Sequence, residues 1–462
     1  MNSIGNKHQL TRFPPGSIFE VLHIAFPLML AALSVNLMMF CDRIILAYYS
    51  LQAMNAVAIA TMFIAVFQFG IIAIVSIAEV FVGQHNGAKR YQQLAEPVWQ
   101  MIWLSLASFI IFMPLAFFTG KWVLPPHYHT LGITYYKIIT AFSPIMALSA
   151  ALSAFFIGRG KTKLVMYLTV SANILNLCLD IILIFGLKNF IPALGTTGAA
   201  IATTVAECMQ FFILLLVFLN RNNRTHYATG RAYFNLKVLL QCIRIGTPNS
   251  IGHMLEIAAW AFLLNIMAYI STTHVTLVAI GSNIYVLFAF FTDGLEKGIS
   301  TISANYIVAK LTSMIKMVLR SGISVLLIMI TLLAIPLLFF PNIIINIFIS
   351  QSQHINNLTV IRHYLNIALL GVWVFLIFDG IVWVIAGILT AAGDTLFIMF
   401  VNAGSTWLFA ILPIYILVVR YSLSPEWTWF FIAAYTVVNC LLFYLRYRQG
   451  KWQRLNIHAV NI

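Results

Sequence analysis

Acidic side chains stand inside long apolar stretches of this 462-residue chain, where an ionised carboxylate is costly. Of the twelve Asp and Glu residues, the interior candidates are Asp42, Glu79, Asp180, Glu207, Glu256, Asp293, Glu296 and Asp379. Such an acid is tolerated mainly where it faces a protein interior or a water-filled cavity. There it can exchange a proton, coordinate a cation or balance the charge of a cationic ligand.

The first cluster of candidates combines acids with amides. Asn176 and Asp180 are four residues apart and share one helix face, with Asn173 one turn earlier. If Asp42 and Thr203 converge on that face, they form a set of oxygen ligands that suits a proton or Na⁺. The alternative is a hydrogen-bonded polar knot that only holds helices together. Two acids and two amides favour the ion site, and we predict no other metal site.

The second cluster of candidates comprises two acids, each isolated among apolar neighbours in the sequence. Glu256 and Asp379 can each carry a proton or, once ionised, act as the counter-charge of a cationic substrate. Phe375 and Trp383 flank Asp379, and an aromatic wall beside an acid suits a flat organic cation.

Three further residues are weaker candidates for this second cluster. His253 lies one turn before Glu256, although a lone helical histidine is more often a satisfied core residue. Asp293 and Glu296 lie within one turn of Lys297, and the spacing of Asp293 and Lys297 also fits an internal ion pair.

Composition defines the elements that must position these groups. Hydrophobic residues make up 61% of the chain and charged residues 8%, far below the soluble average of about 25%. The chain is therefore predicted to be a polytopic membrane protein, with no removable signal peptide. About 20 apolar residues cross a bilayer, and twelve runs qualify: 18–47, 54–82, 97–119, 132–157, 163–187, 195–219, 237–270, 276–308, 320–349, 361–390, 396–420 and 426–447.

A polar break after the sixth run divides the chain. We predict an N-terminal six-helix lobe over residues 1–219, a cytoplasmic linker over 220–236 and a C-terminal six-helix lobe over 237–462. Nineteen Lys and Arg residues fall on the side that holds both termini and four on the other. This bias places both termini in the cytoplasm. It also excludes nucleic-acid binding, because the basic residues are spread over many short loops. The five cysteines form neither a disulfide framework nor a metal site.

The two halves resemble each other in sequence. Ala25-Phe26-Pro27 matches Gly246-Thr247-Pro248, and Gly158-Arg159-Gly160-Lys161-Thr162 matches Ala391-Ala392-Gly393-Asp394-Thr395, in the same order and at similar offsets. A parallel internal repeat of this kind puts a substrate path between two lobes.

Several of these residues together resemble the multidrug and toxic compound extrusion (MATE) antiporters. The matching features of the first half are Pro27 with Asp42, Gly83 to Ala88, Gly160-Lys161-Thr162, Asn176 to Asp180, and Gly195 to Thr203. The second half resembles the NorM-like bacterial branch through Pro248 with Glu256 and Asp379 with Gly393-Asp394.

The resemblance implies an all-α fold of twelve transmembrane helices, arranged as two pseudo-symmetric six-helix bundles in a V. It also implies alternating access and export of organic cations in exchange for Na⁺ or H⁺, without a cofactor. By position, Asp42, Asn176, Asp180 and Thr203 would form the cation or proton site of the first lobe, and Glu256 with Asp379 the ion or drug site of the second.

Two positions depart from the family pattern. NorM-like proteins often carry a tyrosine where this chain has Phe375, and the stretch from Ile302 to Lys310 lacks the Gly-Gln-x-x-Gly-Ala pattern of the first half. Neither the coupling ion nor the substrate follows from the sequence.

Other functions remain as alternatives. A lipid-linked oligosaccharide flippase of related architecture should line its cavity with Arg or Lys, whereas the interior of this chain is acidic. A membrane-embedded enzyme needs a converging nucleophile or metal set, and the spans contain none. We therefore expect a monomeric, non-enzymatic transporter of the bacterial inner membrane, with small cationic substrates and membrane lipid as its partners.

Overall fold

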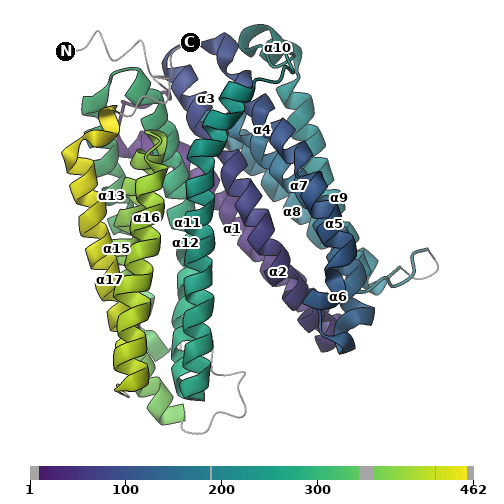
Figure 1. Cartoon of the computed structure of the whole chain (residues 1–462), viewed down its shortest axis with the longest axis vertical. Helices are drawn as coiled ribbons and strands as arrows, with labels where there is room; N and C mark the ends of the chain where they lie inside the picture. Colours follow the sequence, from purple (N-terminus) through teal and green to yellow (C-terminus); the bar gives the residue numbers. More distant parts are fainter. Residues whose placement is uncertain (1–9, 188–189, 343–357, 422, 455–462) are drawn as a thin grey trace. The chain divides into compact units, whose positions relative to one another are not determined.

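The computed structural model describes residues 10–187, 190–342, 358–421 and 423–454, which form helices joined by short loops (Figure 1). Within these ranges, eleven helical segments are long and apolar enough to cross a membrane, and the bent helix α12 (Thr272–Val308) raises the number to twelve. The β-structure in these ranges is one isolated bridge between Leu187 and Ile191. The predicted all-helical polytopic fold is confirmed.

Contacts divide the chain into two compact units, and each is described by itself. Unit 1 holds residues 26–250 with two short additions, 10–11 and 304–311, from the described part of the chain. Its helices are α1 (Ile18–Tyr49) from Phe26 onward, α2 (Leu51–Ser76), α3 (Ala78–Gly87), η2 (Tyr91–Gln93), α4 (Ala95–Ala107), α5 (Phe109–Phe118), α6 (Gly120–Val123), η3 (Pro126–Tyr128), α7 (His129–Gly158), α8 (Thr162–Phe185), α9 (Thr196–Phe218), α10 (Arg221–Tyr227) and the start of α11 (Leu236–Ile270).

Unit 2 holds residues 12–25, 251–303 and the described residues from Thr312 on. Its further helices are α13 (Thr312–Ala334), η4 (Ile335–Phe339), α15 (Leu358–Ala391), α16 (Thr395–Ser405), η5 (Thr406–Ile411), η6 (Ile414–Arg420), α17 (Trp427–Gln449) and η7 (Lys451–Arg454), of which η4, η5 and η6 are π-helical. The predicted span 320–349 ends outside the described residues. The predicted division at 220–236 stays a prediction.

Each unit is built around one helix that is more buried than its neighbours. In unit 1 this is α7, which packs against α2 and α9, and in unit 2 it is α15, which packs against α13 and α17. A helix surrounded on all sides is apolar all round, whereas an outer helix leaves one face to lipid. Because α7 is the fourth span and α15 the tenth, the central helices hold equivalent places in a six-span repeat.

Corresponding loops of the two halves of the chain share the same backbone geometry. Gly160 and Gly393 both have left-handed backbones, with φ of 72° and 81°. In both loops the next residue donates its N–H to a carbonyl five residues back, the Schellman geometry that ends a helix. Lys89 and Lys310 repeat the same turn with φ of 58° each. The stretch that lost its sequence pattern before Lys310 has therefore kept its backbone conformation.

The segment between α9 and α11 is fastened to α4 by side chains of unit 1. Gln100 accepts a hydrogen bond from the Asn235 N–H at 2.9 Å and donates to the Tyr233 carbonyl at 3.0 Å. Trp99 donates to the Thr229 carbonyl at 3.0 Å. This segment is thus held against unit 1 rather than free, because its backbone groups are satisfied by neighbouring side chains.

Candidate functional site

Two acids of unit 1 meet inside the membrane-spanning part of the protein. Asp42 lies on α1 and Asp180 on α8, and their carboxyl groups are hydrogen-bonded to each other. Asp180 is only 1% exposed. Two ionised carboxylates within hydrogen-bonding distance repel each other strongly in a medium of low dielectric constant. The pair therefore requires a proton or a cation between its oxygens.

An amide and a hydroxyl complete this pair. In the orientation that satisfies its neighbours, Asn176 donates from its amide nitrogen to Asp42 Oδ1 at 3.1 Å and accepts from Thr203 Oγ1 at 3.2 Å. Asn176 is fully buried on α8, one turn before Asp180. Asp180 Oδ1 has no hydrogen-bond partner among the described residues. The structure thus brings together the four residues that the sequence predicts, and it leaves one carboxylate oxygen open.

Two neighbours extend this group. Asn173 donates to Ser34 Oγ at 2.7 Å and so ties α8 to α1. Tyr135 of α7 interacts electrostatically with both acids and shares a hydrogen bond of 3.3 Å with Thr61. The sequence analysis missed Tyr135. A tyrosine within an apolar span was a usable signal, since its buried hydroxyl needs a polar partner.

In unit 2, Asp379 lies on the central helix α15 and is 6% exposed. Trp383, one turn later on the same helix, donates its indole N–H to Asp379 Oδ2 at 3.0 Å. His253 of α11 stacks on the Trp383 ring, with centroids 5.6 Å apart and planes 9° apart. Asp379 and Glu256 interact electrostatically. The predicted second cluster is therefore gathered in space.

Helix α12 contributes three further charged residues near these acids: Asp293, Glu296 and Lys297. Asp293 interacts electrostatically with Glu256 and Asp379, and also with Lys297 one turn away. Glu296 is half-buried on the same turn. Asp293 therefore adds negative charge to the second cluster, and Lys297 moderates it.

An aromatic group adjoins the acids of unit 2. Phe375 is buried and makes edge contacts with Trp260 at 6.1 Å and Tyr285 at 5.2 Å between ring centroids. Trp260 stacks on Tyr285 at 5.9 Å and contacts Trp429 at 6.1 Å. The indole N–H of Trp260 has no hydrogen-bond partner among the described residues.

Tyr285 is relevant to the position of Phe375, where NorM-like proteins often carry a tyrosine. Its hydroxyl interacts electrostatically with Asp379, Glu256 and Asp293. A phenol therefore stands beside the acid of α15 after all, although it comes from α12. Sequence reasoning looked for it one turn before Asp379, and only the packing of α12 against α15 reveals it.

The donor sets of the two clusters suit different cations. In the described part of the chain no three or more His, Cys, Asp and Glu side chains gather as a metal-binding group. Hard monovalent or divalent cations take oxygen ligands, and Asp42, Asp180, Asn176 and Thr203 supply such oxygens. The unit 2 cluster offers carboxylates next to aromatic rings, which suits an organic cation.

Comparisons with known proteins agree with this architecture. A family model described as MatE matches residues 27–182 and 249–416. A probable multidrug resistance protein NorM of Thermotoga maritima is 25% identical over 441 residues, which cover 94% of this chain and 93% of that protein. The probable multidrug resistance protein YoeA of Bacillus subtilis is 25% identical over 401 residues, 84% of this chain and 83% of that protein.

Solved structures share the fold. A crystal structure of a MATE protein in complex with MaL6 superposes with a TM-score of 0.85 at 16% identity, covering 98% of this chain and all of the other. A transporter of the MOP superfamily from Pyrococcus furiosus gives 0.81 at 17% identity, with 99% and 98% covered. A Vibrio cholerae MATE transporter gives 0.80 at 19% identity, with 96% and 98% covered.

Proposed function

Because the chain belongs to the MatE family and is an integral membrane transporter, we propose that it exports organic cations in exchange for Na⁺ or H⁺. The names of its relatives, multidrug resistance proteins, support drug-like substrates. The distribution of Lys and Arg supports a bacterial inner membrane with both termini in the cytoplasm. The transporter works as a monomer without a cofactor.

One observation carries this proposal: the hydrogen bond between the carboxyl groups of Asp42 and Asp180. Because the two hydrogen-bonded carboxyl groups share one proton, the pair carries one negative charge, which one Na⁺ or one further proton entering from outside neutralises. This lowers the cost of closing the site away from water, because a buried unpaired charge is expensive. When the ion leaves toward the cytoplasm, the pair becomes charged again and favours renewed hydration.

The remaining ligands decide what the pair can hold. A proton needs only the two carboxylates, whereas Na⁺ also needs neutral oxygens to replace its water shell. The Asn176 amide and the Thr203 hydroxyl are placed to supply them, and Asp180 Oδ1 has a free coordination position. Both coupling ions fit this arrangement.

The organic cation binds in unit 2 under this proposal. Asp379 and Glu256 supply the counter-charge, and the partly buried rings of Trp260 and Tyr285, which pack on Phe375, adjoin these acids. Cation–π contacts contribute about 0.5–2 kcal/mol each, depending on desolvation. Several aromatic contacts together with the two acids give a site that tolerates cationic substrates of different shape.

Coupling then follows from thermodynamic linkage. If ion and drug each favour opposite conformations, each must weaken the binding of the other by the same factor. Exchange therefore needs no direct contact between the two ligands.

The flippase alternative fits the interior less well. A pyrophosphate headgroup carries negative charge and requires Arg or Lys around it. Apart from Lys297, the charged residues of both clusters are instead acids: Asp42 and Asp180 in unit 1, and Glu256, Asp293 and Asp379 in unit 2.

The test is ethidium efflux from liposomes that contain the purified protein, with a Na⁺ gradient and a pH gradient imposed separately. We expect transport under at least one gradient and none in empty liposomes. Transport under Na⁺ alone assigns Na⁺ to the Asp42–Asp180 pair, and transport under the pH gradient alone assigns a proton. Failure under both gradients would refute antiport and bring back the flippase.

A further inference from the structure

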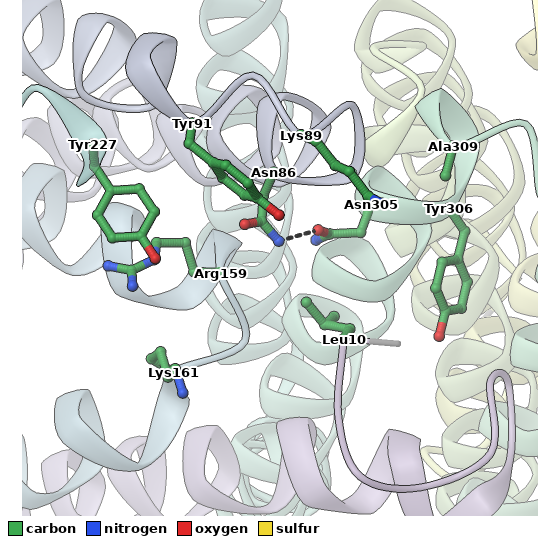
Figure 2. Close-up of a pocket in the computed structure, with 11 residues that line it drawn as sticks. Leu10, Asn86, Lys89, Tyr91, Arg159, Lys161, Tyr227, Asn305, Tyr306 and Ala309 are labelled. Carbon is green, nitrogen blue, oxygen red and sulfur yellow. Dashed lines mark hydrogen bonds between the residues drawn. The ribbon is translucent and has the colours of Figure 1, made fainter. Parts of the chain in front are cut away.

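A polar cavity of about 250 Å³ lies within unit 1, and none of its lining residues belongs to either acidic cluster. Figure 2 shows its walls, which come from loops and helix ends far apart in sequence. They are the end of α3 and the turn after it, the loop between α7 and α8, helix α10, and the last turns of α12, which belong to unit 1. By the Lys and Arg distribution, these loops lie on the cytoplasmic side.

Three cationic side chains line this cavity: Lys89, Arg159 and Lys161. No Asp or Glu is among its lining residues. In the described ranges, none of the three cations forms an ion pair with a carboxylate. Arg159 is partly buried and the two lysines are exposed, so this cavity presents an excess of positive charge that no acid among the described residues balances.

Arg159 is held in place by aromatic rings rather than by an acid. Its guanidinium carbon lies 3.8 Å from the centroid of Tyr227 and 4.6 Å from that of Phe155. Figure 2 shows it beside Tyr227 at one side of the cavity. Burial lowers the pKa of Arg159, and its hydrogen bond to the Tyr227 hydroxyl acts in the opposite direction. Stacking fixes the plane of the guanidinium, and the N–H groups that do not bond to Tyr227 remain for a ligand.

The opposite wall is also fixed before any ligand arrives. Asn86 donates to Asn305 Oδ1 at 2.7 Å, the dashed line in Figure 2. Asn305 in turn donates to the Gly158 carbonyl at 3.0 Å. A Cβ at Gly87 would overlap the Asn305 carbonyl, so the loop that carries Lys89 lies directly on this wall. A preformed site loses little free energy to ordering when it binds.

The matching loop of unit 2 is built differently. At the position of Lys161 it carries Asp394, which forms a two-pronged ion pair with Arg446 at 2.7 and 3.0 Å. The charge of the equivalent loop is thus balanced by a side chain of α17 within unit 2. The unbalanced charge around Arg159 is therefore no requirement of the repeated fold.

We propose that this cavity binds a phosphate group, carried either by the headgroup of an anionic lipid or by free phosphate. Phosphate offers oxygens for two or three cationic donors at once, and Arg engages it in bidentate fashion. The volume is below the range of about 300–1,000 Å³ that drug-sized ligands occupy, but a phosphate with a small substituent fits. Anionic lipid headgroups are present at the cytoplasmic surface, where the loops lie.

Two arms of one experiment separate the sources. In the first arm, the detergent-purified protein is titrated with inorganic phosphate at constant ionic strength, and its thermal unfolding is followed, with chloride as the reference anion. In the second arm, native mass spectrometry counts lipids retained from vesicles of phosphatidylcholine with or without phosphatidylglycerol. Stabilisation by phosphate, retention of one phosphatidylglycerol, or both would support the site. The absence of both effects would overturn the proposal.

Variants tie either signal to the cavity. Arg159→Gln should weaken binding about tenfold, the loss of one charge-assisted contact, and Lys89→Gln with Lys161→Gln should abolish it. Arg159→Lys keeps the charge and should retain part of the binding. Lys163→Gln is the matched control, because Lys163 is exposed two residues beyond Lys161 and does not line the cavity. An equal loss in Lys163→Gln would overturn the proposal and indicate unspecific surface charge.

Discussion

The acids of unit 1 and those of unit 2 are surrounded by different chemistry. Asp42 and Asp180 are hydrogen-bonded to each other and are bordered by an amide and a hydroxyl. Asp379 instead accepts from an indole and lies beside stacked aromatic rings. A tight set of oxygens leaves room only for a proton or a bare ion, whereas an acid against aromatic faces accommodates an organic cation. Under the proposed function, the repeated fold would hold two cation sites of different size.

The largest effect is expected from Asp180→Asn. It removes the charge that a coupling ion must neutralise, so efflux under either gradient should fall to the passive leak of empty liposomes. Ethidium binding to the detergent-purified variant should remain within about threefold of the unchanged protein, since the proposed drug ligands belong to unit 2 and share no side chain with the Asp42–Asp180 pair. Ethidium efflux and fluorescence binding measure the two properties. Efflux at the normal rate would show that the carboxyl pair is only a polar link between helices.

Asp379→Asn should instead weaken the binding of the organic cation. Loss of a buried counter-charge typically costs about 2 kcal/mol or more, so the Kd for ethidium should rise about thirtyfold. Isothermal titration with tetraphenylphosphonium gives an independent value. If this variant binds both cations normally while losing transport, Asp379 carries a proton instead, and the two units would not differ in the way described above.

Helix periodicity foresaw the part of the unit 1 site that lies on α8, and the family resemblance implied Asp42 and Thr203. Asn173, Asn176 and Asp180 follow one face of a helix because their spacing matches its turn. The structure brings Asp42 and Thr203 to that face, as expected. The role of these residues in ion binding stays a prediction. Local spacing succeeds here because three of the five residues share one helix.

The aromatic part of the unit 2 site could not be foreseen in the same way. Phe375 indicated a missing phenol, yet Tyr285 stands near Asp379 from another helix. Which faces of two long apolar helices meet depends on packing, and nearly uniform hydrophobicity leaves little trace of it in the sequence. The turn at Lys310 was missed for another reason. Its backbone conformation repeats that of Lys89, but the residues before it no longer follow the sequence pattern of the first half.

A smaller effect is expected from Trp383→Phe. The exchange keeps a ring for His253 to stack on and removes the hydrogen bond of 3.0 Å to Asp379. One such bond contributes about 1 kcal/mol, so the Kd for ethidium should rise about fivefold. Trp122→Phe is the control, because Trp122 is 84% exposed on unit 1 and should leave the Kd unchanged. An equal change in both variants would remove Trp383 from the substrate site.

The smallest change, Thr203→Val, distinguishes the two coupling ions at the unit 1 pair. Valine keeps the shape of threonine and removes the hydroxyl that bonds to Asn176. A lost neutral oxygen ligand costs about 1 kcal/mol, so Na⁺-driven efflux should need about five times more Na⁺ for half its maximal rate. Efflux under a pH gradient should be unchanged, because a proton requires only the carboxylates. Thr203→Ser retains the oxygen and should behave normally. An equal loss under both gradients would make the hydroxyl a link between α8 and α9 and not an ion ligand, and the oxygen set that separates unit 1 from unit 2 would shrink to its two acids and one amide.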